Sequence, residues 1–147
     1  MITVEIDFDL GRINLDFHRE LNTIGTIIRE DHTKRLQRGM DVNRKQMTPL
    51  KDATIKNKGF NQILRDTGQM SNLVIDKADK TNQTVIIHPG AKRKRGKVTS
   101  QDIGGFHQRG YEPNNLPQRK WFGISKRAEA KAIKMIELRM EREIRRA

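Results

Sequence analysis

The chain has 147 residues, of which 34% are hydrophobic, 5% aromatic and 33% charged, with a net charge of +12 and no Cys. This length fits one domain over 1–147, and the lack of Cys excludes disulfides and suits a reducing cytoplasm. Apolar runs fall short of the ~20 residues of a membrane helix, and residues 1–9 lack the basic and apolar regions of a signal peptide, so a soluble protein with no membrane partner is expected.

Residues 2–8 alternate apolar, mostly β-branched residues with polar ones, which predicts a strand. A cap at Asn14 or Asp16 is expected to begin a long helix, and Gly39 to end it after about residue 38. Four apolar residues recur at spacings of 4, 3 and 4, the pattern of an amphipathic helix: Phe17, Leu21, Ile24 and Ile28.

The middle of the chain predicts a polar loop over 39–48 and then a short helix. Thr48 and Pro49 have the form of an N-cap and a first helical residue, so the helix is expected from residue 49 or 54 to about residue 66. Gly68 is expected to end this helix, and Gly59 to weaken or break it.

Two strands are predicted at 72–77 and 83–88, joined as a hairpin by a polar turn. An exposed basic loop is expected at 90–101, and the Gly- and Pro-punctuated segment 102–123 is expected to be irregular. The fold class is therefore α+β: a small antiparallel sheet packed with a long N-terminal helix, a short middle helix and a C-terminal helix at 125–146.

The C-terminal helix follows from a run of strong helix formers without Gly or Pro, which Ser125 can cap. Trp121 and Phe122 precede it and are expected to dock it on the sheet, with an exposed anchor for a subunit interface as the alternative. Its apolar stripe consists of Ile133, Ile136, Met140 and Ile144, widened by Ala132, Met135 and Leu138.

No pattern for catalysis, a cofactor or a metal is found. Gly90 and Gly96 enclose five residues, whereas a phosphate-binding loop needs four and a Ser or Thr directly after its Lys. The four His are far apart in sequence, and the consecutive Glu30, Asp31 and His32 would point in different directions on a helix, so they are assigned to a solvated polar face. The sequence therefore predicts a protein without enzymatic activity.

The positive charge is concentrated in two places. Residues 1–90 sum to +2, whereas 91–97 carry +5 and 118–147 carry +6, which implies a polyanionic neighbour or an acidic protein surface. Since the first cluster lacks interleaved aromatic residues, contact with nucleic acid would be to the backbone and blind to sequence. A solvated charge run remains the alternative for these candidate DNA-channel or interface residues: Lys92, Arg93, Lys94, Arg95 and Lys97.

The segment 104–110 is expected to form a tight, Gly-hinged turn, in which His107 and Gln108 act as hydrogen-bond anchors for buried backbone groups. A catalytic role for this pair has no partner nucleophile in the sequence.

Taken in order, these signals resemble the virion morphogenesis proteins of Mu-like tailed phages, the tail-completion family. In that family an N-terminal strand and helix precede a Pro-Leu segment, then a Thr-Gly turn, a hairpin, a His-Gln-x-Gly segment and a final Pro- and Gly-containing segment before the last helix. The resemblance covers roughly residues 2–145. The matching or aligned structural residues are Pro49, Leu50, Thr54, Lys58, Leu64, Thr67, Gly68, Met70, His107, Gln108, Gly110, Pro117, Arg119, Trp121, Phe122, Gly123 and Ser125.

The resemblance implies a structural virion protein of the head–tail junction, assembled in the bacterial host cytoplasm. It implies a homo-hexameric ring around the DNA channel, with the tail tube protein, a head-completion or connector protein and the genomic DNA as partners. The alternative is a free-standing, sequence-nonspecific DNA- or RNA-binding protein, and a nuclease ranks third because its carboxylates or metal ligands are not found.

Overall fold

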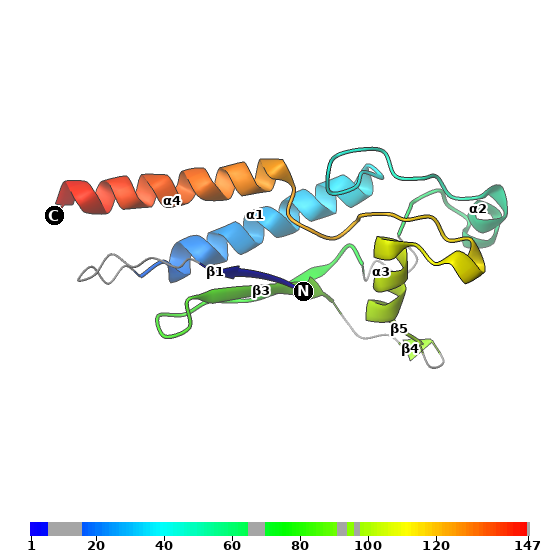
Figure 1. Ribbon diagram of the computed structural model, residues 1–147, viewed down its shortest axis with the longest axis horizontal. Coiled ribbons are helices and arrows are strands. Elements are labelled where there is room, and N and C mark those ends of the chain that lie inside the picture. Colours follow the sequence, from blue (N-terminus) through cyan, green and yellow to red (C-terminus); the bar gives the residue numbers. More distant parts are fainter. Residues whose placement is uncertain (6–15, 65–69, 91–93, 96–97, 147) are drawn as a thin grey trace.

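The structure, a computed structural model, describes residues 1–5, 16–64, 70–90, 94–95 and 98–146. It has the α+β fold that the sequence predicts. One half consists of three layers, in which α4 (Lys126–Arg146) covers α1 (His18–Gln37) and α1 covers a small antiparallel sheet (Figure 1). The other half holds α2 (Asp52–Lys58), α3 (Ser100–Arg109) and the turn-rich segments around them.

The three-stranded sheet has the order β1–β3–β2, and both strand pairs are antiparallel. β1 is Ile2–Glu5, β2 is Leu73–Asp76 and β3 is Thr84–Pro89. Val85 and Ile87 on β3 are fully buried, as expected where alternate side chains face the core. The hairpin and the N-terminal strand are thus confirmed, and the expected continuation of that strand to residue 8 lies outside the described residues.

α1 packs one stripe of apolar side chains on the sheet, which confirms the predicted amphipathic helix. Leu21, Ile24 and Ile28 are at most 2% exposed, and burying each of them contributes about 1.5–3 kcal/mol. Gly25 permits this close packing, because a Cβ there would lie 3.1 Å from Val85 Cγ1. The helix ends as expected, before a left-handed glycine at position 39.

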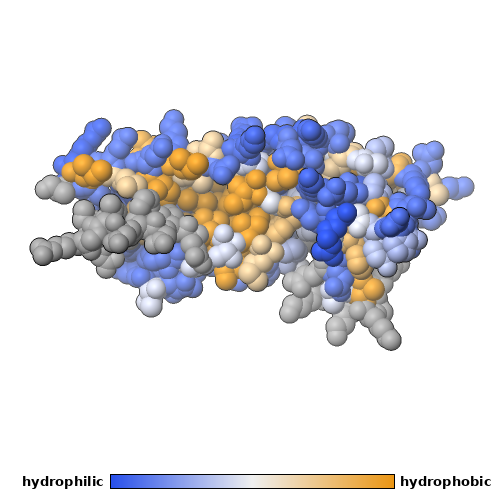
Figure 2. All heavy atoms as spheres, in the orientation of Figure 1, coloured by the Kyte–Doolittle hydropathy of each residue, from blue (hydrophilic) through white to orange (hydrophobic). Residues whose placement is uncertain are grey.

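α4 confirms the predicted C-terminal helix, and Ser125 caps it, since Ser125 Oγ accepts from the Ala128 N–H at 3.2 Å. The apolar stripe of this helix is covered only in part. Ile133 and Ile144 are 53% and 70% exposed. Figure 2 shows hydrophobic residues at the surface along α4 and between α4 and the strands, with hydrophilic residues around them. The residues that pack against the core with Ala128 are Ala132, Met135, Ile136 and Met140.

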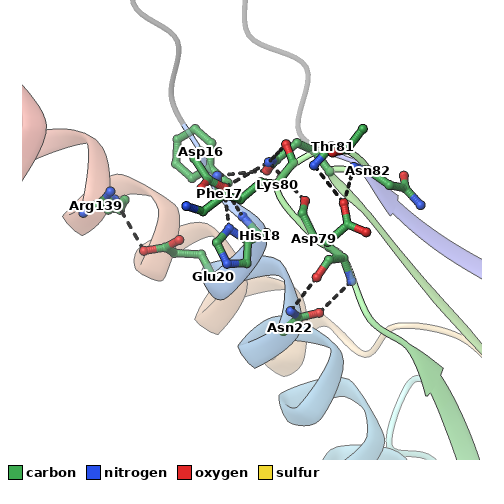
Figure 3. Close-up of polar contacts among 12 residues, drawn as sticks. Asp16, Phe17, His18, Glu20, Asn22, Asp79, Lys80, Thr81, Asn82 and Arg139 are labelled. Atoms are coloured by element: carbon green, nitrogen blue, oxygen red, sulfur yellow. Dashed lines mark hydrogen bonds and ion pairs between the residues drawn. The ribbon is translucent and has the colours of Figure 1, made fainter.

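Two side-chain amides fasten the β2–β3 turn to the start of α1 (Figure 3). Asn22 donates to the Ala78 carbonyl at 2.9 Å and accepts from the Ala78 N–H at 2.8 Å. The Gln83 side chain accepts from the Phe17 N–H and donates to Asp16 Oδ1, both at 2.9 Å. Asp16, one of the two predicted caps, lies one residue before the N-cap position, which Phe17 occupies. The Gln83 bond satisfies the Phe17 N–H at the start of the helix, and the Asn22 bonds satisfy the backbone N–H and carbonyl of Ala78.

The middle helix departs from the prediction at both ends. Pro49 does not begin α2, because the chain stays extended through Lys51 at ψ 147° and the helix starts one residue later. Gly59 then takes a left-handed φ of 76° and ends the helix, which was expected to reach residue 66. The predicted stop at Gly68 lies outside the described residues.

The described residues of the stretch 90–101 are more regular than the loop that the sequence predicts. β4 (Lys94–Arg95) pairs antiparallel with β5 (Val98–Thr99), and α3 begins directly after β5. Residues 91–93 and 96–97 lie outside the described part of the chain.

The segment 102–123 is also more regular than expected, since α3 extends through residue 109 and a 3-10 helix, Glu112–Asn114, follows. Thr99 and Asp102 form a capping box: Thr99 Oγ1 accepts from the Asp102 N–H at 3.2 Å, and Asp102 Oδ2 accepts from the Thr99 N–H at 2.8 Å. This cap offsets part of the ~1 kcal/mol that each glycine inside the helix costs relative to Ala.

Candidate assembly and nucleic-acid interface

Five motif residues belong to or pack against a second core cluster, in the half of the molecule that holds α2 and α3: Leu50, Leu64, Met70, Trp121 and Phe122. Trp121 is 3% exposed, and its Nε1–H donates to the Gly104 carbonyl at 2.9 Å. Its ring lies 5.3 Å from that of Phe122, between centroids. Trp121 is therefore a buried anchor, but it joins α3 to the end of α1 and does not dock α4 on the sheet. The other buried members of the cluster are Leu36, Met47, Ile63 and Leu64.

Arg119, 4% exposed, fastens the loop before α2 to this cluster. Its Nε donates to the Thr48 carbonyl at 3.1 Å and its Nη2 to the Pro49 carbonyl at 3.4 Å. Its Nη1 lies 3.4 Å from His107 Nδ1. Burial, then the charges of Arg119 and Lys58, lowers the pKa of His107 to about 4. His107 is thus neutral near pH 7, and its Nδ1 can accept from the guanidinium.

Gln108 confirms the predicted role as a hydrogen-bond anchor. Its amide donates to the Phe122 carbonyl and its side-chain oxygen accepts from the Phe122 N–H, both at 3.1 Å. The predicted turn geometry is wrong, however, because residues 104–109 lie within α3. His107 contributes mainly through its backbone, whose carbonyl accepts from the Arg119 N–H at 2.6 Å.

The remaining motif residues shape the chain around this cluster. Gly110 has a φ of 81°, and a Cβ there would lie 3.3 Å from Gln118 N, so the position favours glycine. Lys58 Nζ donates to the Gln62 carbonyl at 3.2 Å. Thr67 and Gly68 lie outside the described residues. Pro49 and Thr54 are exposed, whereas the half-buried members are Leu50, Met70, Pro117 and Gly123.

A polar cluster that the sequence analysis missed joins α1, the following loop and α4. Asp31 Oδ2 accepts from Arg35 Nε at 2.9 Å and from Ser125 Oγ at 2.7 Å, and Asp31 Oδ1 pairs with Arg44. Burial raises the pKa of Asp31, but the bonds from Ser125 and Arg35 and the two arginine charges outweigh it and hold this pKa below its ordinary value. The carboxylate is therefore charged and serves as a structural hub.

His32 is 0% exposed, so its assignment to a solvated polar face is wrong, whereas Glu30 is exposed as expected. Arg35, one turn further along α1, is 1% exposed. His32 Nε2 lies 3.0 Å from the Met70 carbonyl, which makes it the donor in the neutral ring. Burial lowers the pKa of His32 to about 4. Arg35 also lies within 3.4 Å of the Trp121 and Gly123 carbonyls.

The basic segment projects as a small hairpin at the opposite end of the molecule from the C-terminal end of α4 (Figure 1). Lys94 and Arg95 form β4, and their partners in β5 are Thr99 and Val98. The other three candidate cations, Lys92, Arg93 and Lys97, lie outside the described residues. The hairpin is tied to the fold by α3, which starts at the end of β5.

Among the described residues, no group of three or more His, Cys, Asp or Glu side chains is placed to hold a metal ion. Of the helices described, none has the length and apolar character needed to cross a bilayer. Comparison of the chain with protein-family models, curated proteins and solved structures gives no match.

Proposed function

We propose that this protein is a structural component of a tailed-phage virion that completes the tail and joins it to the head. In this proposal identical subunits form a hexameric ring around the DNA channel, between the tail tube protein and the head-completion or connector protein. It has no catalytic activity, and its place is the neck of the virion.

The observation that carries this proposal is the ordered string of motifs shared with Mu-like tail-completion proteins. In the described residues these motifs supply a buried Trp in the second core cluster, a buried Arg bonded to the loop before α2, a glycine turn and the cap of α4: Trp121, Arg119, Gly110 and Ser125. Such roles specify a fold and its assembly. They support a structural protein over an enzyme.

The basic hairpin gives the proposed ring a contact for DNA. Five cations within residues 91–97 match a polyanion, and β4 and β5 present Lys94 and Arg95 from a two-stranded unit. Contact would be with the phosphate backbone, as is required of a channel through which any sequence passes.

Electron microscopy of the purified protein and of virions tests the proposal. Rings with a central bore, and tails of abnormal length or without heads in a phage that lacks the gene, are expected. A monomer that is absent from virions, together with normal tails in the deletion phage, would contradict it.

The second candidate function is a free-standing DNA- or RNA-binding protein, favoured by the same basic cluster. Salt-dependent binding separates the two candidates only in combination with oligomeric state. Salt-dependent binding by a protein that stays monomeric would support this second function over the ring.

A further inference from the structure

A groove between α1 and α4 remains open on the side of the helices away from their shared core. It has a volume of about 460 Å³, and its apolar lining comes from both helices: Ile27, Met135 and Leu138. Leu138 is 43% exposed. Because two packed helices leave a channel along their seam, this site has the shape that takes a third helix.

The rim of this groove is strongly basic. Arg139 is the one rim cation that is neutralised within the described chain, since it pairs with Glu20 at 3.4 Å (Figure 3) and with Glu143 at 2.7 Å. The other four form no ion pair among the described residues: Arg19, Lys131, Lys134 and Arg142. An occupant should therefore carry carboxylates beside an apolar stripe.

The opposite flank of α4 carries that combination. Ile133 and Ile144 are the most exposed apolar residues of the helix, at 53% and 70%, and Met140 lies beside them at helical spacing. Glu129 and Glu137 lie on the same flank and form no ion pair with any other described residue. At about 100° per residue, Lys131 and Leu138 fall on the other side of the buried stripe.

We infer that the α1–α4 groove of one copy binds the flank of α4 that carries Glu129, Ile133 and Glu137 on a second copy. Each copy then presents both a basic apolar groove and an acidic apolar ridge. DNA fits the groove less well, because phosphates do not cover an apolar floor.

The two surfaces differ, so the contact is head-to-tail, and it closes into a ring when the rotation between copies allows. This inference rests on the proposed ring and assigns its subunit contact. Since the basic hairpin lies at the other end of the molecule from the C-terminal end of α4, the contact leaves the hairpin free to meet DNA.

Paired charge reversals test this contact by sedimentation velocity on the full chain. The groove variant carries Lys131→Glu and Lys134→Glu, and the ridge variant carries Glu129→Lys and Glu137→Lys. Each variant alone places like charges across the contact, so self-association should weaken by about tenfold or more. An equimolar mixture should regain it, because alternating copies join opposite charges at every contact: one contact has the charges reversed, and the next has the wild-type charges.

The matched control for the groove variant is Lys77→Glu with Lys80→Glu, which lowers the net charge by the same amount on exposed residues near the β2–β3 turn. Circular dichroism checks that every variant keeps its helices. Wild-type rings that both reversals leave intact would overturn this contact while the proposed ring stands. A wild-type protein that stays monomeric, or a groove that binds only an acidic partner protein, would overturn the contact, and the monomer would count against the ring as well.

Discussion

Asp31 is where three separate segments of the chain are joined through one carboxylate. Its side chain is 10% exposed and binds Arg35, itself 1% exposed, as well as Arg44 and Ser125. The hydrogen bonds from these three donors offset the free-energy cost of desolvating the carboxylate. Removing the carboxylate would leave the buried guanidinium of Arg35 unpaired. The residue holds the end of α1 to the start of α4.

We expect Asp31→Asn to destabilise the protein by about 3 kcal/mol or more, since the amide cannot neutralise the two arginines. Urea unfolding at pH 7 measures this difference. Asp76→Asn is the matched control, because the Asp76 side chain is 61% exposed and its loss should change the free energy of unfolding by less than ~0.5 kcal/mol. Equal effects of the two substitutions would contradict a structural hub at Asp31.

His32 makes stability depend on pH. Burial lowers its pKa from 6.5 to about 4, so the unfolded chain takes up the proton first. The stabilisation is therefore complete above pH 6.5 and is lost as the pH falls from 6.5 toward 4. Between pH 7 and pH 5 the free energy of unfolding should fall by about 2 kcal/mol from this residue.

Urea unfolding of the wild type and of His32→Gln at both pH values measures this contribution. His88→Gln, at a half-buried ring at the end of β3, serves as the control. A wild-type pH dependence that His32→Gln leaves unchanged would assign the effect to other groups, of which His107 is the first candidate because burial lowers its pKa in the same direction.

The buried polar residues of α1 show where sequence reasoning reaches its limit. The spacing of Ile28, His32 and Arg35 continues the apolar stripe by steps of 4 and 3, and that signal was available. Ionisable residues are seldom buried without partners, so sequence reasoning assigns His32 to solvent with Glu30 and Asp31. The partner Ser125 lies 94 residues from Asp31 in the chain, and no single-sequence pattern pairs residues at that distance.

At the scale of elements, α3 depends on how closely Trp121 approaches it. A Cβ at Gly104 would lie 2.8 Å from Trp121 Cζ2. The neighbouring Gly105 faces only the flexible Arg109 guanidinium, at 3.2 Å. Two glycines in the same helix thus differ sharply in the space that they leave.

This difference predicts opposite outcomes for the same substitution. Gly104→Ala should destabilise by about 1–3 kcal/mol through overpacking on the indole, despite the higher helix propensity of Ala. Gly105→Ala should be neutral or stabilise by up to about 1 kcal/mol. Thermal unfolding of the two variants measures the two changes in stability. An increase in stability for Gly104→Ala would mean that the indole does not lie against α3.

The elements that the sequence predicted correctly are those with sustained periodicity: α1, α4 and the β2–β3 hairpin. α3 was missed because its two glycines suggested a turn. Its one local signal was Thr99 three residues before Asp102, a capping-box spacing. The indole that packs against Gly104 belongs to Trp121, and this tertiary contact explains why a glycine is needed at that position of the helix.

For the whole molecule, charge and packing are arranged along the long axis. The strands β4 and β5 lie in the half of the molecule that holds α3 and the second core cluster, and the C-terminal end of α4 lies at the opposite end (Figure 1). A surface that binds DNA and a surface that binds another subunit can therefore be altered independently.

Replacing all five cations of residues 92–97 by Ser should abolish most DNA binding and leave the oligomer intact. With five phosphate contacts, the log–log dependence of affinity on salt has a slope of about −4.5, and the variant should approach a slope near zero. Fluorescence anisotropy of a short duplex across a salt series gives the slope, and sedimentation velocity gives the oligomeric state. The substituted residues are Lys92, Arg93, Lys94, Arg95 and Lys97.

Lys77→Ser with Lys80→Ser controls for a general loss of positive charge on the exposed side chains near the β2–β3 turn. It should leave the slope within about one contact of the wild-type value, because each lost phosphate contact changes it by roughly 0.9. An unchanged slope in the five-Ser variant would place DNA elsewhere on the protein. Loss of the oligomer in that variant would instead indicate that residues 92–97 form part of the contact between subunits.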